Sequence, residues 1–87
     1  MENGIIDLRV TDESGQALPG VNISISGPER RKGVTNVEGL ARFPEVPLGE
    51  YEVTASLEGF DSDTQKARVE LPERAAFLRF TLKIAPN

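Results

Sequence analysis

The sequence has 87 residues, a length that suits one domain of ordinary size. It contains no cysteine, histidine or tryptophan, which excludes disulfides, thiol nucleophiles, imidazole bases and the nitrogen and sulfur ligands usual in zinc sites. Its 14 acidic and 10 basic side chains give a net charge of -4, so the average electrostatic field repels phosphate and nucleic acid is not an expected partner.

The first part of the chain alternates apolar and polar residues, which is the period of a strand with one buried face. Ile6, Leu8 and Val10 alternate with polar neighbours and predict the first strand. The segment 12–15 then favours a turn, and a second alternation over residues 21–26 predicts the second strand. Helical spacing is absent from these segments, so we expect strands here.

The middle of the chain predicts two short strands. The third lies around Val34 and is followed by a turn at 36–39. The fourth covers residues 40–43, with Leu40 on its outward face. We expect Pro44 to end this strand because proline has no N–H to donate to a neighbouring strand.

The rest of the chain predicts three further strands. Residues 46–49 favour a tight turn, and the fifth strand follows at 51–57. Two more alternating segments predict strands at 65–71 and 77–84, and the second of these alternations places Phe77 outward and Ile84 inward. Residues 73–76 between them are too few for a stable helix, so we expect a loop.

Strands that are apolar on one face only must pair that face with another layer. We therefore predict an all-β fold in which residues 1–87 form one seven-stranded antiparallel Greek-key β-sandwich. The expected strands lie near residues 5–11, 21–26, 33–36, 40–43, 51–57, 65–71 and 77–84.

Several of these turns occur in an order that resembles a known family. The stretch 35–53, followed by Glu58-Gly59-Phe60 and preceded by the segments 12–15 and 18–21, is similar to the carboxypeptidase regulatory-like domains, a branch of the prealbumin-like (transthyretin-like) β-sandwiches. The similarity covers nearly the whole chain. It departs from the family pattern at Ala41, where an aromatic residue is common, and this implies a slimmer core or one filled from a neighbouring strand.

The resemblance implies a non-catalytic accessory module of bacterial secreted and envelope proteins. Its expected location is therefore extracellular, periplasmic or at the cell surface. The expected partners are another protein or the flanking domains of the same polypeptide. No apolar stretch reaches the length of a membrane span, and the segment 1–4 has no signal-peptide features, so we expect neither membrane insertion nor a targeting signal in this chain.

Enzymatic relatives of this fold need residues that the chain lacks. Sandwiches that hydrolyse hydroxyisourate rely on histidines, and dioxygenases of similar architecture hold iron with tyrosines and histidines. This chain has no histidine and one tyrosine, Tyr51, at an inward strand position where a core or corner tyrosine is expected. Adhesin repeats with an isopeptide bond need an inward Lys, Glu and Asn or Asp, but the inward positions here are uncharged. We expect no enzyme, no cofactor and no isopeptide bond.

Three acidic residues form a candidate calcium site. Glu58, Asp61 and Asp63 offer the carboxylate oxygens that calcium favours on loops. Their spacing matches only a fragment of a calcium-binding loop. A solvated acidic turn is therefore the preferred interpretation, and no metal is expected.

The basic residues Arg30, Arg31 and Lys32 form a candidate partner contact on the connection between the second and third strands. They suit an acidic protein surface or an anionic glycan. The alternative is that three exposed charges only keep this hairpin soluble, and we prefer it.

Leu40, Leu48 and Phe77 form a second candidate contact, because the alternation places these apolar side chains outward or on a loop. Ordinary scatter of single apolar residues over the surface is the preferred alternative, since the sequence does not show whether the three lie together.

The sequence thus predicts a non-catalytic module for structure or protein-protein interaction in a larger extracytoplasmic bacterial assembly. The alternative is a ligand-binding module that holds glycan or calcium with its end loops. Self-association through the edge strands of the sandwich is also compatible with the pattern.

Overall fold

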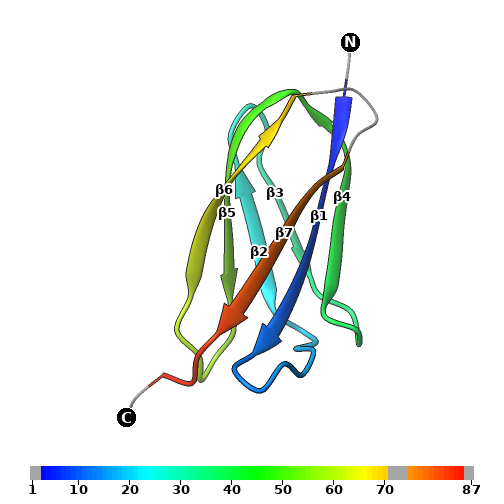
Figure 1. Ribbon diagram of the computed structural model, residues 1–87. Coiled ribbons are helices and arrows are strands. Elements are labelled where there is room, and N and C mark those ends of the chain that lie inside the picture. The colour runs from blue at the N-terminus through cyan, green and yellow to red at the C-terminus, as the bar shows by residue number, and fades with distance from the viewer. Residues whose placement is uncertain (1–2, 71–74, 86–87) are drawn as a thin grey trace.

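The computed structural model describes residues 3–70 and 75–85. Within these ranges the chain forms seven strands in two sheets that pack face to face (Figure 1), which confirms the predicted β-sandwich. The described residues contain no helix long and apolar enough to cross a membrane. The strands are β1 (Asn3–Asp12), β2 (Asn22–Ser26), β3 (Arg31–Val34), β4 (Leu40–Pro47), β5 (Gly49–Ser56), β6 (Asp63–Val69) and β7 (Ala75–Leu82).

The two sheets share one apolar core. One sheet has the strand order β4-β1-β7 and the other β3-β2-β5-β6. Along β1, β2 and β5, alternate residues point into the space between the sheets, as the sequence predicts. The fully buried side chains include Ile6, Leu8 and Val10 of β1, and Ile23 of β2 and Val53 of β5 across the core.

The first and last of these strands, β1 and β7, pair in parallel. Residues 5–12 of β1 lie opposite residues 75–82 of β7 in an unbroken register. The prediction of a wholly antiparallel sandwich is therefore wrong for this pair. Parallel neighbours need a long crossover connection, which the five strands between them supply as the chain crosses between the sheets.

Strand β4 continues past Pro44, so the prediction that this residue ends the strand is wrong. Phe43 pairs with Ile6, whereas Val46 pairs with Gly4, so β4 contains one residue more than β1 over this interval. The extra residue forms a β-bulge, and Glu45 takes a φ of 56°. Proline is tolerated here because β4 is an edge strand, and proline and the bulge together hinder pairing with another chain along this edge.

Other strand limits also differ from the prediction. Ala75 and Ala76, expected in a loop at 73–76, belong to β7, where they pair with β1; residues 73 and 74 lie outside the described residues. Ile84, expected to face inward, is 73% exposed because β7 ends at Leu82, and its backbone only bridges to Phe60. The sixth strand, expected at 65–71, begins and ends two residues earlier, at Asp63 and Val69; residue 71 itself lies outside the described residues.

The third strand begins and ends earlier than predicted, at Arg31 and Val34. Thr35 follows this strand and ties two loops together. Its buried hydroxyl accepts a hydrogen bond from the Val21 N–H (2.9 Å) and donates one to the Leu18 carbonyl (2.6 Å). Because both hydrogen bonds are made, they offset the cost of burying this hydroxyl, and Thr35 holds the two loops together.

Candidate functional site

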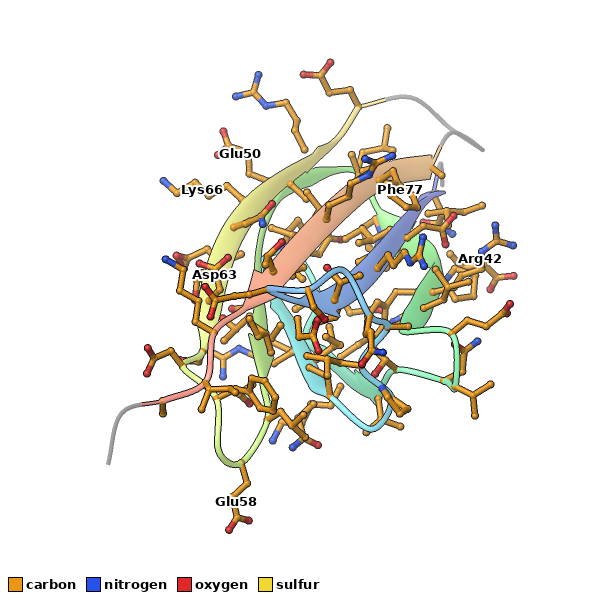
Figure 2. The ribbon with its side chains drawn as sticks, turned by 60° about the horizontal axis from the view of Figure 1, so that its bottom comes forward. Arg42, Glu50, Glu58, Asp63, Lys66 and Phe77 are labelled. Atoms are coloured by element: carbon orange, nitrogen blue, oxygen red, sulfur yellow. The ribbon has the colours of Figure 1, made fainter. Side chains whose placement is uncertain are left out.

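A shallow hollow of about 310 Å³ opens on the outer face of the β4-β1-β7 sheet. The strand register places Arg42, Asp7 and Phe77 in one row across the sheet and Leu40, Arg9 and Arg79 in the next. Figure 2 shows Arg42 and Phe77 projecting on the same side of the molecule. The lining residues are Asp7, Leu8, Asn36, Leu40, Ala41, Arg42 and Phe77.

Two of the three apolar residues in the predicted contact meet at this hollow. Leu40 is 37% exposed and Phe77 is 53% exposed, and both line it. They belong to strands far apart in sequence, and they come together because β4 and β7 flank β1 on opposite sides. The third residue, Leu48, instead lies half-buried against the core at the crossing from β4 to β5.

An ion pair between Asp7 and Arg42 also lines the hollow, next to these apolar side chains. The Arg42 guanidinium donates hydrogen bonds to both carboxylate oxygens of Asp7, at 2.8 Å and 3.1 Å. The Asp7 side chain is only 18% exposed, and its hydrogen bond and charge raise the pKa of Arg42. A guanidinium that binds a carboxylate with two parallel bonds is held in orientation as well as in charge.

Cations outnumber anions in these two rows of side chains. Arg9, Arg42 and Arg79 project there against one carboxylate, that of Asp7. The Arg79 guanidinium lies 5.9 Å from the centre of the Phe77 ring, a distance that permits cation–π attraction. The lining residues include no nucleophile paired with a base. This face therefore offers apolar side chains beside cationic ones, an arrangement that can contact an apolar side chain together with an acidic group.

The three basic residues of the other predicted contact line one hollow, but Arg31 differs from the other two in its hydrogen bonds. Arg31 turns back onto the β4 bulge and donates hydrogen bonds to the carbonyls of Pro44 and Glu45, the latter at 2.8 Å. It also pairs with Glu29. Its role is therefore structural. The sequence does not indicate this role, because the bulge forms only where β4 pairs with β1, a strand distant in sequence.

The other two, Arg30 and Lys32, are exposed. Together with Arg31, Ser24 and Ser26 they line a hollow of about 460 Å³ beside β2. This hollow belongs to the β3-β2-β5-β6 sheet, whereas Leu40 and Phe77 belong to the other sheet. The two predicted contacts are therefore separate surfaces.

The acidic residues considered for calcium do not gather. Figure 2 shows Glu58 at the tip of the connection between β5 and β6, pointing away from Asp63. The Asp61 backbone N–H is bound to the Lys83 carbonyl at 2.8 Å, which holds this segment against the end of the chain. Over residues 3–70 and 75–85, no three acidic side chains approach closely enough to hold one metal ion.

Tyr51 lies in the core, as predicted. It is buried, and its hydroxyl donates a hydrogen bond to the Pro47 carbonyl at 2.6 Å across the turn from β4 to β5. Burial raises the pKa of the Tyr51 hydroxyl, because the charged form loses its hydration there. The residue therefore anchors the turn and is not available at a surface site.

Comparison with known structures shows the same fold in proteins of very different kinds. The chain matches the Bacillus anthracis TIE protein with 20% identity and a TM-score of 0.85, over 97% of this chain and 17% of that one. It matches the group B streptococcus pilus 2b backbone protein with 12% identity and a TM-score of 0.77, over 95% of this chain and 42% of that one. It matches the Acinetobacter radioresistens catechol 1,2 dioxygenase with 12% identity and a TM-score of 0.82, over 99% of this chain and 53% of that one.

The chain thus spans less than two thirds of each of these three proteins, and at such identities the likeness shows the fold alone. A comparison with curated protein sequences gives no significant match. Residues 5–83, in contrast, match the family model of the carboxypeptidase regulatory-like domain. Because this match covers most of the chain, the protein belongs to the carboxypeptidase regulatory-like domain family.

Proposed function

We propose that this chain is a non-catalytic β-sandwich module for structure or protein-protein interaction in a larger extracytoplasmic bacterial assembly, and that it meets a protein partner or a flanking domain through the outer face of the β4-β1-β7 sheet. The observation that carries this proposal is the hollow in which Leu40 and Phe77 stand beside the Asp7–Arg42 ion pair. Exposed apolar side chains with an arginine beside them are typical of the central part of a protein interface, which becomes buried when the partner binds.

The structural neighbours support an accessory role at the cell surface. The sandwich makes up 17% of the TIE protein chain and 42% of the pilus backbone protein chain, so in both it is one part of a longer polypeptide. A pilus backbone is an assembly of protein subunits. A module that contributes shape and a contact surface suits such a setting.

The residues of the chain also support the absence of catalysis. It has no cysteine or histidine to serve as nucleophile or base. The single tyrosine, Tyr51, is buried and its hydroxyl is bound to a backbone carbonyl. We therefore infer that the likeness to the dioxygenases is one of fold and not of activity.

Site-specific photo-crosslinking in the source organism tests this proposal. Benzoylphenylalanine replaces Phe77 in one variant and, as the control, the exposed Lys66 on the opposite sheet in another. We expect an adduct of defined mass from position 77 and none from position 66. Equal crosslinking from both positions, or none from position 77 with the variant folded, would contradict the proposal.

A further inference from the structure

The parallel pair of β1 and β7 suggests a mechanical role. Eight consecutive residue pairs, from Ile5–Ala75 to Asp12–Leu82, join the two strands without a break. Figure 1 shows both arrows pointing to the same end of the sandwich, with the start of β1 and the end of β7 at opposite ends. We propose that residues 5–12 and 75–82 form a clamp that resists tension applied along the chain.

The direction of loading decides how this clamp responds. Tension pulls on β1 at Asn3 and on β7 at Leu82, so the two strands are drawn past each other along their own length. The evenly spaced hydrogen bonds of a parallel ladder then carry the load together. Had the force entered both strands at one end, the same bonds would open one after another. Loading in shear therefore gives a much higher barrier than unzipping.

The side chains of the clamp oppose sliding as well. Ile6, Leu8 and Val10 are fully buried, as are Phe80 and Leu82 on β7. A shift of the register by one residue sets the inward side chains of one strand beside the outward side chains of the other. The strands must therefore remove apolar groups from the core before they separate.

Both strands of the clamp are also held from outside it. Strand β1 is bound on its other edge to β4, where Arg42 grips Asp7 with two hydrogen bonds. Strand β7 is an edge strand, but the Gln65 side chain of β6 donates a hydrogen bond to the Arg79 carbonyl at 2.6 Å. These attachments keep either strand from peeling away sideways when the chain is stretched.

This inference rests on the proposed function in one respect, namely that neighbouring parts of an assembly transmit tension to the sandwich. The resistance itself is a property of this chain and is measured on it alone. The crosslinking experiment applies no force and tests only the contact surface, whereas the force measurement tests only the clamp. A failure of one proposal is therefore distinguishable from a failure of the other.

Single-molecule force spectroscopy with two attachment geometries provides the test. In the first geometry, handles at both ends of the chain load the clamp in shear. In the second, one handle stays at the N-terminal end and the other is joined to an Ala75→Cys variant, which is possible because the chain has no cysteine of its own. Residue 75 is exposed and starts β7, so this geometry unzips the clamp.

We expect the unfolding force at equal pulling speed to be several times higher end to end than from position 75. The Ala75→Cys variant pulled end to end serves as the control and should match the unmodified chain. Equal forces in the two geometries would overturn the clamp.

A matched pair of core substitutions separates mechanical from thermodynamic stability. Val10 in the clamp and Val53 on β5 are both 0% exposed, so Val10→Ala and Val53→Ala remove the same atoms from the same core. Urea unfolding measures the equilibrium loss of each, and forced unfolding reports the barrier along the pulling direction. We expect Val10→Ala to lower the end-to-end force more than Val53→Ala for the same equilibrium loss. An equal or greater effect of Val53→Ala would overturn the proposal.

Discussion

Asp12 and Asn36 occupy equivalent positions in two turns of the same construction. In each turn the side-chain Oδ1 accepts hydrogen bonds from the backbone N–H groups two and four residues later, at 2.9 Å and 3.0 Å. In each turn a glycine with positive φ lies three residues after this residue, Gly15 at 91° and Gly39 at 75°. Both turns were predicted from the sequence, and their common geometry allows one to serve as the control for the other.

The Asp12 turn should make the stability of the protein depend on pH. Hydrogen bonds, first from the Ser14 hydroxyl and then from the Gln16 N–H, lower the pKa of the Asp12 carboxyl below 3.8. A lowered pKa in the folded state adds stability that is present above the ordinary pKa and lost as the pH falls through the folded value. Asp12→Asn keeps the acceptor without the titration, as Asn36 does, so it should lose less stability in acid than the unmodified chain. Urea midpoints between pH 7 and pH 2 measure this, and identical profiles would contradict it.

The two glycines should differ in their tolerance of alanine. A Cβ at Gly39 would lie 2.5 Å from the Val10 carbonyl oxygen, whereas a Cβ at Gly15 would meet nothing within 4 Å. Both substitutions carry the backbone penalty of a positive φ, about 1–2 kcal/mol. We expect Gly39→Ala to cost more than Gly15→Ala, because the backbone of β1 must also move. Urea unfolding gives both values, and equal losses would refute the close approach.

Arg31 should matter to stability far more than its neighbour. Its guanidinium binds the carbonyls of Pro44 and Glu45 at the β4 bulge, whereas Arg30 is exposed. Because hydrogen bonds to a charged group contribute about 1.5–3 kcal/mol, and solvent reaches this site, we expect Arg31→Ala to lower the free energy of unfolding by about 1–2 kcal/mol. Arg30→Ala should change it by less than about 0.5 kcal/mol. Similar values for the two variants would show that the bulge does not need the arginine.

Tyr51 should limit stability at high pH. Burial raises the pKa of its hydroxyl above 10.0, so the folded state favours the neutral form. A raised pKa adds stability that is present below the ordinary value and lost as the pH rises through the folded value. Tyr51→Phe should therefore flatten the alkaline limb of the stability curve, at a cost of about 1–2 kcal/mol near pH 7 for the lost bond to Pro47. With only one tyrosine in the chain, tyrosinate absorbance reports this group alone, and its midpoint in the folded protein should lie above 10.0. A midpoint at or below 10.0 in the folded protein would contradict this.

The sequence predicts which side chains of a strand point into the core, but it does not predict which strands pair with each other. Alternation at Ile6, Leu8 and Val10 identifies the inward side chains because it depends only on the local backbone. The parallel pairing of β1 with β7 depends on how the whole chain crosses between the sheets, which no local pattern encodes. The bulge has a local sign in the sequence: the apolar residues Phe43 and Val46, both buried, are three positions apart, which breaks the period of two.

For the candidate site, too, the sequence predicts which side chains face outward but not which of them lie together. The alternation places Leu40 and Phe77 outward, but only the strand order brings β4 and β7 to either side of β1. Leu48 and Arg31 were placed on the surface by their positions near turns. Leu48 packs on the core and Arg31 binds the bulge, and both arrangements depend on segments remote in sequence.

The most direct test of the proposed interface combines the photo-crosslinker at position 77 with the substitution Leu40→Gln. Leu40 lines the same hollow but lies on a different strand, and it is exposed enough to be replaced without emptying the core. If the outer face of the β4-β1-β7 sheet binds a partner, the adduct from position 77 should be strongly reduced while the melting temperature stays the same. An adduct that forms in undiminished yield would contradict a contact surface built on Leu40 and Phe77.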